Sequence, residues 1–146
     1  MASDIEDICD EIVTYLTGLY PGVFSSIERV TVPRFDPESL NTGSPLINVV
    51  GAGRTSENVN RGFRQYTYTV LIFIVQAVPA VNGNETDDLQ ELTVEISNHL
   101  ERLSLTAARA KEQSVAVTLF DADALQTENR FQSLITLTLV GGHRSV

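Results

Sequence analysis

One long strand pattern constrains the fold of this chain more than any other feature. From Phe63 to Val78 the sequence reads FRQYTYTVLIFIVQAV, a run rich in β-branched and aromatic residues. Such residues favour the pleated, half-buried surface of a β-strand. Fifteen extended residues span about 50 Å, whereas a usual strand has about five or six residues. The sequence therefore predicts a strand that extends beyond the core of a small domain.

The alternation within this strand predicts which of its faces is buried. Successive residues of a strand point to opposite faces, so one face carries the side chains of Tyr66, Tyr68, Val70, Ile72 and Ile74. The other face begins with polar residues and turns apolar later in the strand. We expect the first half of the strand to project as a hairpin arm with the strand before it, with GAGRTSENVNRG (51–62) near the tip. Because an isolated two-stranded arm is marginal in water, this arm would lie on a neighbouring molecule.

Helical and strand patterns divide the rest of the chain. Apolar residues recur at helical spacing over residues 5–16 and 89–103. Ser3 and Glu6 form a capping box before the first helix and Gly18 fits its end, while Asn84 or Thr86 can cap the second. Shorter strand patterns read ERVTVPR (28–34), LINVVG (46–51), SVAVTLF (114–120) and RFQSLITLTLV (130–140). The predicted fold is one α+β domain over residues 1–146, in the order α-β-β-β-α-β-β. Its mostly antiparallel five-stranded sheet has two helices packed on it.

Charge restricts the classes of partner. The chain of 146 residues has 10 basic and 19 acidic side chains, a net charge of −9. A protein that grips a nucleic-acid backbone needs clustered positive charge. We therefore expect no such grip, and we interpret the acidic face of the first helix, with Asp7 and Asp10, mainly as a solvated face. The acidic start of the chain does not fit a signal peptide, and no apolar run reaches the length of a membrane span. The sequence thus predicts a protein that is soluble and intracellular when made.

The residues with chemical potential do not form a catalytic pattern. Cys9, the single cysteine, falls on the apolar stripe of the first helix and is expected to be a buried small hydrophobe. Gly51 and Gly53 resemble the start of a dinucleotide loop, but the residues that follow lack an apolar helical face. His99 has no second histidine or cysteine at ligand spacing. The sequence therefore predicts no catalytic residue, cofactor or metal.

Three arginines gather after the glycine pair, and two interpretations of them stay open. Arg54, Arg61 and Arg64 lie in a polar loop and in the strand that follows it. They are either part of a solvated loop or the one locally positive patch of an acidic protein. At the tip of a projecting arm, such a patch could meet the acidic surface of an adjacent copy.

The order of these elements resembles a known family. A short N-terminal helix, a strand ending near a proline with an FDP loop, and a hairpin with glycine and arginine come first. The long YTYTVLIFIV strand, an amphipathic helix and two final strands ending in SLITLTLV follow. Nearly the whole chain resembles the tail terminator, or tail completion, proteins of tailed bacteriophages.

The resemblance implies a structural role in the virion tail or neck, after synthesis in the host cytoplasm. Such proteins form a homo-oligomeric ring, a hexamer, which binds the tail tube protein on one face and the neck or head connector on the other. The ring stops elongation of the tube, and DNA passes through an acidic lumen without sequence-specific binding. Arginine and aromatic residues are enriched at interfaces. The predicted subunit interface is therefore Arg54, Arg61, Phe63, Arg64, Tyr66 and Tyr68.

Two alternatives to a tail terminator stay open. Another virion joining protein, such as a head–tail adaptor or a tube-like subunit, would share much of this residue pattern. From a different class, a regulatory α+β domain that binds a small molecule would be stabilised by its ligand.

Overall fold

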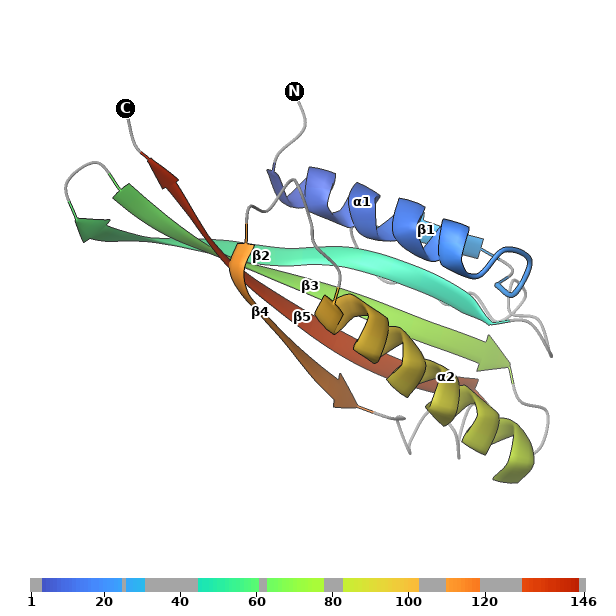
Figure 1. Ribbon diagram of the computed structural model, residues 1–146. Helices are drawn as coiled ribbons and strands as arrows, with labels where there is room; N and C mark the ends of the chain where they lie inside the picture. Colours follow the sequence, from blue (N-terminus) through green and yellow to red (C-terminus); the bar gives the residue numbers. More distant parts are fainter. Residues whose placement is uncertain are drawn as a thin grey trace.

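The described residues fold into one five-stranded sheet with two helices. The computed structural model describes residues 4–24, 26–30, 45–60, 63–77, 83–102, 110–118 and 130–144. In chain order the elements are α1 (Asp4–Leu19), β1 (Ser26–Arg29), β2 (Leu46–Asn60), β3 (Phe63–Ala77), α2 (Gly83–Arg102), β4 (Ala110–Thr118) and β5 (Arg130–Arg144). The strands lie in the order β1-β2-β3-β5-β4 (Figure 1). The predicted α+β class and element order are confirmed. The sheet is mixed, because β1 pairs with β2 in parallel while the other neighbours are antiparallel.

Most predicted element ends are displaced. α1 continues through Gly18 to Leu19, and Ser3 lies outside the described residues. α2 begins at Gly83, so neither Asn84 nor Thr86 precedes it as a cap. β1 begins before the first predicted strand, and the later part of that predicted strand lies outside the described residues. β4 begins earlier than predicted, and β5 ends later than predicted. The glycines near the end of β5 have low strand propensity, but their backbone pairs with the start of β3.

The largest correction concerns residues 51–60, which are strand rather than loop. β2 pairs with β3 as far as the rung Asn60↔Phe63, with register shifts at Gly51/Gly53 and Asn58/Asn60. Only residues 61–62 connect the two strands, and these lie outside the described residues. Glycine, serine and asparagine are depleted in strands as a rule, yet backbone pairing with a long neighbour overrides this local preference. The prediction of a loop was therefore wrong for residues 51–60.

The core lies between the helices and one face of the sheet. α1 packs on β2 and β1, and α2 packs on β4 and β5. The residues fully buried in this layer include Ile8, Ile12 and Leu16 of α1, Ile96 and Leu100 of α2, and Ile47, Ile72, Ile74, Ile135 and Leu137 of the sheet. Below α2 the hydroxyls of Thr93 and Ser133 lie 2.9 Å apart, so these buried polar groups satisfy each other.

The predicted hairpin is present, and β5 runs beside it. All 15 residues of β3 pair with β5, from Phe63↔Arg144 to Ala77↔Arg130, without a register shift. Figure 1 shows the end of this hairpin and of β5 running past the N-terminal end of α1. We call this part of the sheet, β2 from Gly53 onward with the strands paired to it, the arm. The arm is therefore more than an isolated two-stranded hairpin, because β3 is paired on both of its edges.

The contact between α1 and β2 yields a test of the fold. A Cβ atom added at Gly51 would lie 3.0 Å from Cγ1 of Ile5 and 3.4 Å from Sγ of Cys9. We expect Gly51→Val to lower the free energy of unfolding by about 1–3 kcal/mol, because it overpacks this contact. Gly53→Val is the matched control, since a Cβ there meets no atom within 4 Å. Urea denaturation checks both variants, and an equal effect of the two would contradict the close approach of α1.

Candidate interaction surface

Three of the six predicted interface residues meet on the arm. The register shift between Gly51 and Gly53 places Arg54 directly opposite Tyr68. The guanidinium carbon of Arg54 lies 4.9 Å from the ring centroid of Tyr66, the diagonal neighbour across the strands. The rings of Tyr66 and Tyr68 are 6.3 Å apart. The arm therefore carries a cation–π pair supported by a second aromatic ring.

These three side chains differ in how much surface they offer. Tyr68 is fully buried in the core, whereas Tyr66 is partly buried against it. Arg54 is exposed, as is every residue from Gly51 to Glu57. Tyr68 thus supports the pair from inside the subunit, and Arg54 and Tyr66 are the members that can contact another molecule.

The other three predicted interface residues lie toward the end of the arm. Phe63 and Arg64 occupy the first two positions of β3, and Arg61 lies outside the described residues. Arg64 pairs with His143 of β5, and Phe63 pairs with Arg144. Sequence reasoning missed His143 and Arg144, because no local pattern tells which strand lies beside β3. The register thus places basic residues of two distant segments on neighbouring rungs.

The acidic residues of α1 are more than a solvated face. Nε of Arg29 lies 3.1 Å from Oδ1 of Asp10, and its Nη1 lies 3.7 Å from Oε1 of Glu6. These ion pairs connect α1 to the edge strand β1. Exposed pairs of this kind contribute about 0–1 kcal/mol each. They position the short strand β1 rather than form a binding site.

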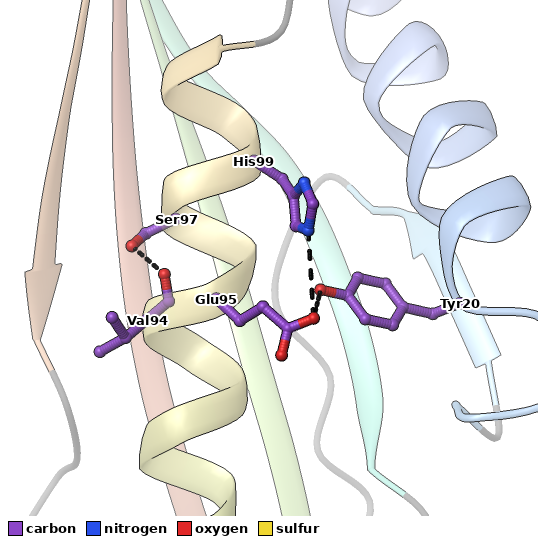
Figure 2. Close-up of polar contacts among 5 residues, drawn as sticks. All are labelled: Tyr20, Val94, Glu95, Ser97 and His99. Atoms are coloured by element: carbon purple, nitrogen blue, oxygen red, sulfur yellow. Dashed lines mark hydrogen bonds and ion pairs between the residues drawn. The ribbon is translucent and has the colours of Figure 1, made fainter.

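A second polar cluster joins the end of α1 to α2 (Figure 2). The hydroxyl of Tyr20 donates a hydrogen bond of 2.9 Å to Oε1 of Glu95, and Nε2 of His99 lies 4.0 Å from the same oxygen. The Tyr20 ring makes edge contacts with the rings of Phe24 and His99. Burial raises the pKa of Tyr20 above its usual value, and the hydrogen bond to Glu95 adds to this. The cluster gives His99 a structural contact that its sequence context did not reveal.

Cys9 is confirmed as a buried core residue. Its side chain is 1% exposed, and burial raises its pKa from 9.0 to about 11. The thiol is therefore protonated near neutral pH and is a poor nucleophile. Among the described residues, no three or more His, Cys, Asp or Glu side chains are grouped closely enough to hold a metal ion.

The glycine pair does not form a dinucleotide loop. Gly51 and Gly53 lie within β2, and the strand continues to Asn60. A phosphate-binding loop of that type requires a helix N-terminus directly after the glycines.

In the part of the chain that the structure describes, no helix is long and apolar enough to cross a membrane.

Comparison with models of known protein families finds no match, and comparison with curated proteins finds none either. Any function must therefore be argued from the residues and the fold.

The contact between the helices predicts a pH-dependent effect. We expect Tyr20→Phe to lower the free energy of unfolding by about 0.5–1 kcal/mol, because it removes the hydrogen bond to Glu95. The folded-state pKa of Tyr20 is raised, so this stability is present below its unfolded pKa of about 10 and is lost as the pH rises through the folded-state value. In Tyr20→Phe, the free energy of unfolding should not show this decrease at alkaline pH. Denaturation between neutral and alkaline pH checks it.

Tyr15→Phe is the matched control for this experiment. Tyr15 lies on α1, just before Tyr20 in the chain, and is partly buried, and its hydroxyl makes no hydrogen bond to the described residues. If both variants lost stability equally, the hydrogen bond of Tyr20 would not be the cause.

Proposed function

We propose that this protein is a virion assembly protein of the tail-terminator type. It forms a closed ring on the end of the tail tube, stops elongation and offers its other side to the neck or head connector. The observation that carries the proposal is the arm, which extends past α1 and is exposed at every residue from Gly51 to Glu57. So long an exposed strand on a single chain is typical of a surface that another chain covers.

The asymmetry of the arm favours a ring of identical copies. The arm is present at one end of the molecule, so an arm that contacts any surface of a second copy other than the second arm makes a heterologous contact. Such heterologous contacts generate closed rings when the rotation closes and open filaments when it does not. The resemblance to tail terminators supports closure, with six copies as the expected number.

The proposed mechanism is steric. One face of the ring binds the last ring of tube subunits, and the other face lacks the surface that the next tube subunit needs. Elongation stops because the growing end is covered. No bond is made or broken, and the net charge of −9 fits a channel through which DNA passes without adhering.

The first test is the mass of the purified protein by light scattering over a range of concentration and salt. We expect one discrete species near six copies. Polymers of undefined length would favour the tube-like alternative. A strict monomer would favour the regulatory domain, and a screen for ligands that raise the melting temperature would then test that domain.

Arg54 provides the test at residue level. We expect Arg54→Ala to weaken association by about ten-fold or more, as interfacial arginines often do, with the fold of the monomer unchanged. Arg102→Ala is the matched control, because Arg102 is also exposed but lies at the end of α2. Light scattering gives the association and circular dichroism the fold. Equal association of both variants would remove Arg54 from the interface.

A further inference from the structure

Among the residues that the structure describes, both outer strands of the sheet leave a backbone edge without a partner strand. β1 pairs with β2 only from Leu46 to Val49, and the amide of Val30 adds a bond of 2.9 Å to the carbonyl of Val49. Among the described residues, no strand pairs with the other edge of β2 from Val50 to Asn60. The same holds for the outer edge of β4, Ala110–Thr118. Within the described part of the chain, each edge thus presents a row of N–H and C=O groups without strand partners.

Each edge carries only part of the protection by which single-chain proteins keep their sheets apart: register shifts interrupt β2 at Gly51/Gly53 and Asn58/Asn60 and β4 at Ala110/Glu112, and the stretches between them stay regular. Edge strands are usually short, or they contain proline or several charged residues. Neither open stretch contains proline, and each is longer than a usual strand of about five or six residues. The β2 stretch has one basic and one acidic residue, Arg54 and Glu57, and β4 has Lys111 and Glu112. Both edges are thus uncharged overall on a protein of net charge −9, so two copies can meet there without net repulsion.

The two edges also fit each other in direction and position. β2, β3, β5 and β4 form three successive antiparallel pairs, so β2 runs antiparallel to β4. If β4 of one copy lay beside β2 of the next, the antiparallel alternation would continue. Thr55 of β2 pairs with Thr67 of β3, Thr67 pairs with Val140 of β5, and Val140 pairs with Glu112 of β4. Residues 110–116 of β4 therefore lie at the level of the open part of β2, whereas Val117 and Thr118 lie at the level where β1 pairs with β2.

We infer that copies of this chain join by backbone pairing, in which β4 of one copy adds antiparallel to the open edge of β2 in the next. The pairing merges the sheets of all copies into one continuous sheet. It uses the regular stretch Gly53–Asn58, which lies between the two register shifts of β2. This inference rests on the proposed ring and identifies the surfaces that close it.

Disulfide trapping tests the pairing directly. Thr55 and the β4 residues Glu112, Ser114 and Ala116 belong to the same face of the sheet, as their rungs show. We expect Thr55→Cys combined with a cysteine at one of these three positions to form disulfides when a mild oxidant takes up the two electrons of each thiol pair. Three positions are needed because the stagger between copies is free. The product on a non-reducing gel should be a ladder that ends at the closed ring.

The design excludes other sources of crosslinking. Within one copy, β2 and β4 are separated by three strand spacings, about 14 Å, whereas a disulfide requires Cα atoms within about 7 Å. Cys9 is 1% exposed and does not compete. Thr55→Cys with Val117→Cys is the matched control, because Val117 is exposed but belongs to the opposite face. It should give no ladder, and Thr55→Cys alone should give no dimer.

Each other outcome has a defined meaning. Absence of crosslinks in all three same-face variants, with a ring still seen by light scattering, overturns the edge pairing and leaves the proposed function intact. Dimers of Thr55→Cys alone also overturn it, because β2 would then pair with β2. Crosslinked polymers without closure support the pairing and overturn the terminator function. Monomers without crosslinks at every concentration overturn both.

Discussion

β3 and β5 pair along the whole length of β3, and the other parts of the fold depend on this ladder. It runs through all 15 residues of β3 without a register shift. The same ladder forms the centre of the core at one end and the arm at the other. Without β5, the arm would be a two-stranded hairpin of marginal stability. With it, Arg54 and Tyr66 are held on a paired sheet, so this surface exists before any partner binds.

The same register divides the side chains between two unlike faces. On one face Val70, Ile72, Ile135 and Leu137 lie under the helices and are fully buried. Directly opposite residues point the same way, so the threonines and the remaining apolar residues of β3 and β5 fall together on the second face. Several of them, such as Thr69, Thr138 and Leu71, are only partly buried. A slip of one residue would exchange these faces, so burial under the helices fixes the register.

The sequence predicted what depends on local period and failed where strands had to find distant partners. Helical spacing located α1 and α2, and the run from Phe63 revealed the long strand β3. Residues 51–60 were predicted as a loop, because their glycine, serine and asparagine content is typical of a loop. They form strand through pairing with β3, and local sequence does not reveal that pairing. The parallel pair of β1 and β2 and the position of β5 between β3 and β4 have no local signal at all.

The candidate surface was predicted as a set of residue types rather than as a geometry. Arginine and aromatic enrichment named Arg54 and Tyr66 as interface candidates, and the structure adds that the two side chains are in contact on the arm. Their contact depends on the bulge at Gly51/Gly53, which sets Arg54 opposite Tyr68. The alternation also placed Tyr68 on the same face as Tyr66, but it could not show that the core ends between them.

In a ring closed through the edges of β2 and β4, the helices would all lie on one side of the wall and the second sheet face on the other. Each copy has two helices of about 10 Å diameter across five strands spaced about 4.8 Å apart, so the helices nearly fill the width of their sheet. The arc inside a closed wall is shorter than the sheet itself, and the helices would therefore lie outside.

The helices carry 11 of the 19 acidic residues, five in α1 and six in α2. The second face of β3, from Thr67 to Val75, has no charged residue. DNA in such a ring would meet threonine hydroxyls and apolar groups, so the acidic lumen expected from the net charge does not follow from this fold. Over this central stretch, passage without adhesion would depend on the absence of charge, while Glu57 and Arg130 add one charge of each sign to the same face toward its two ends.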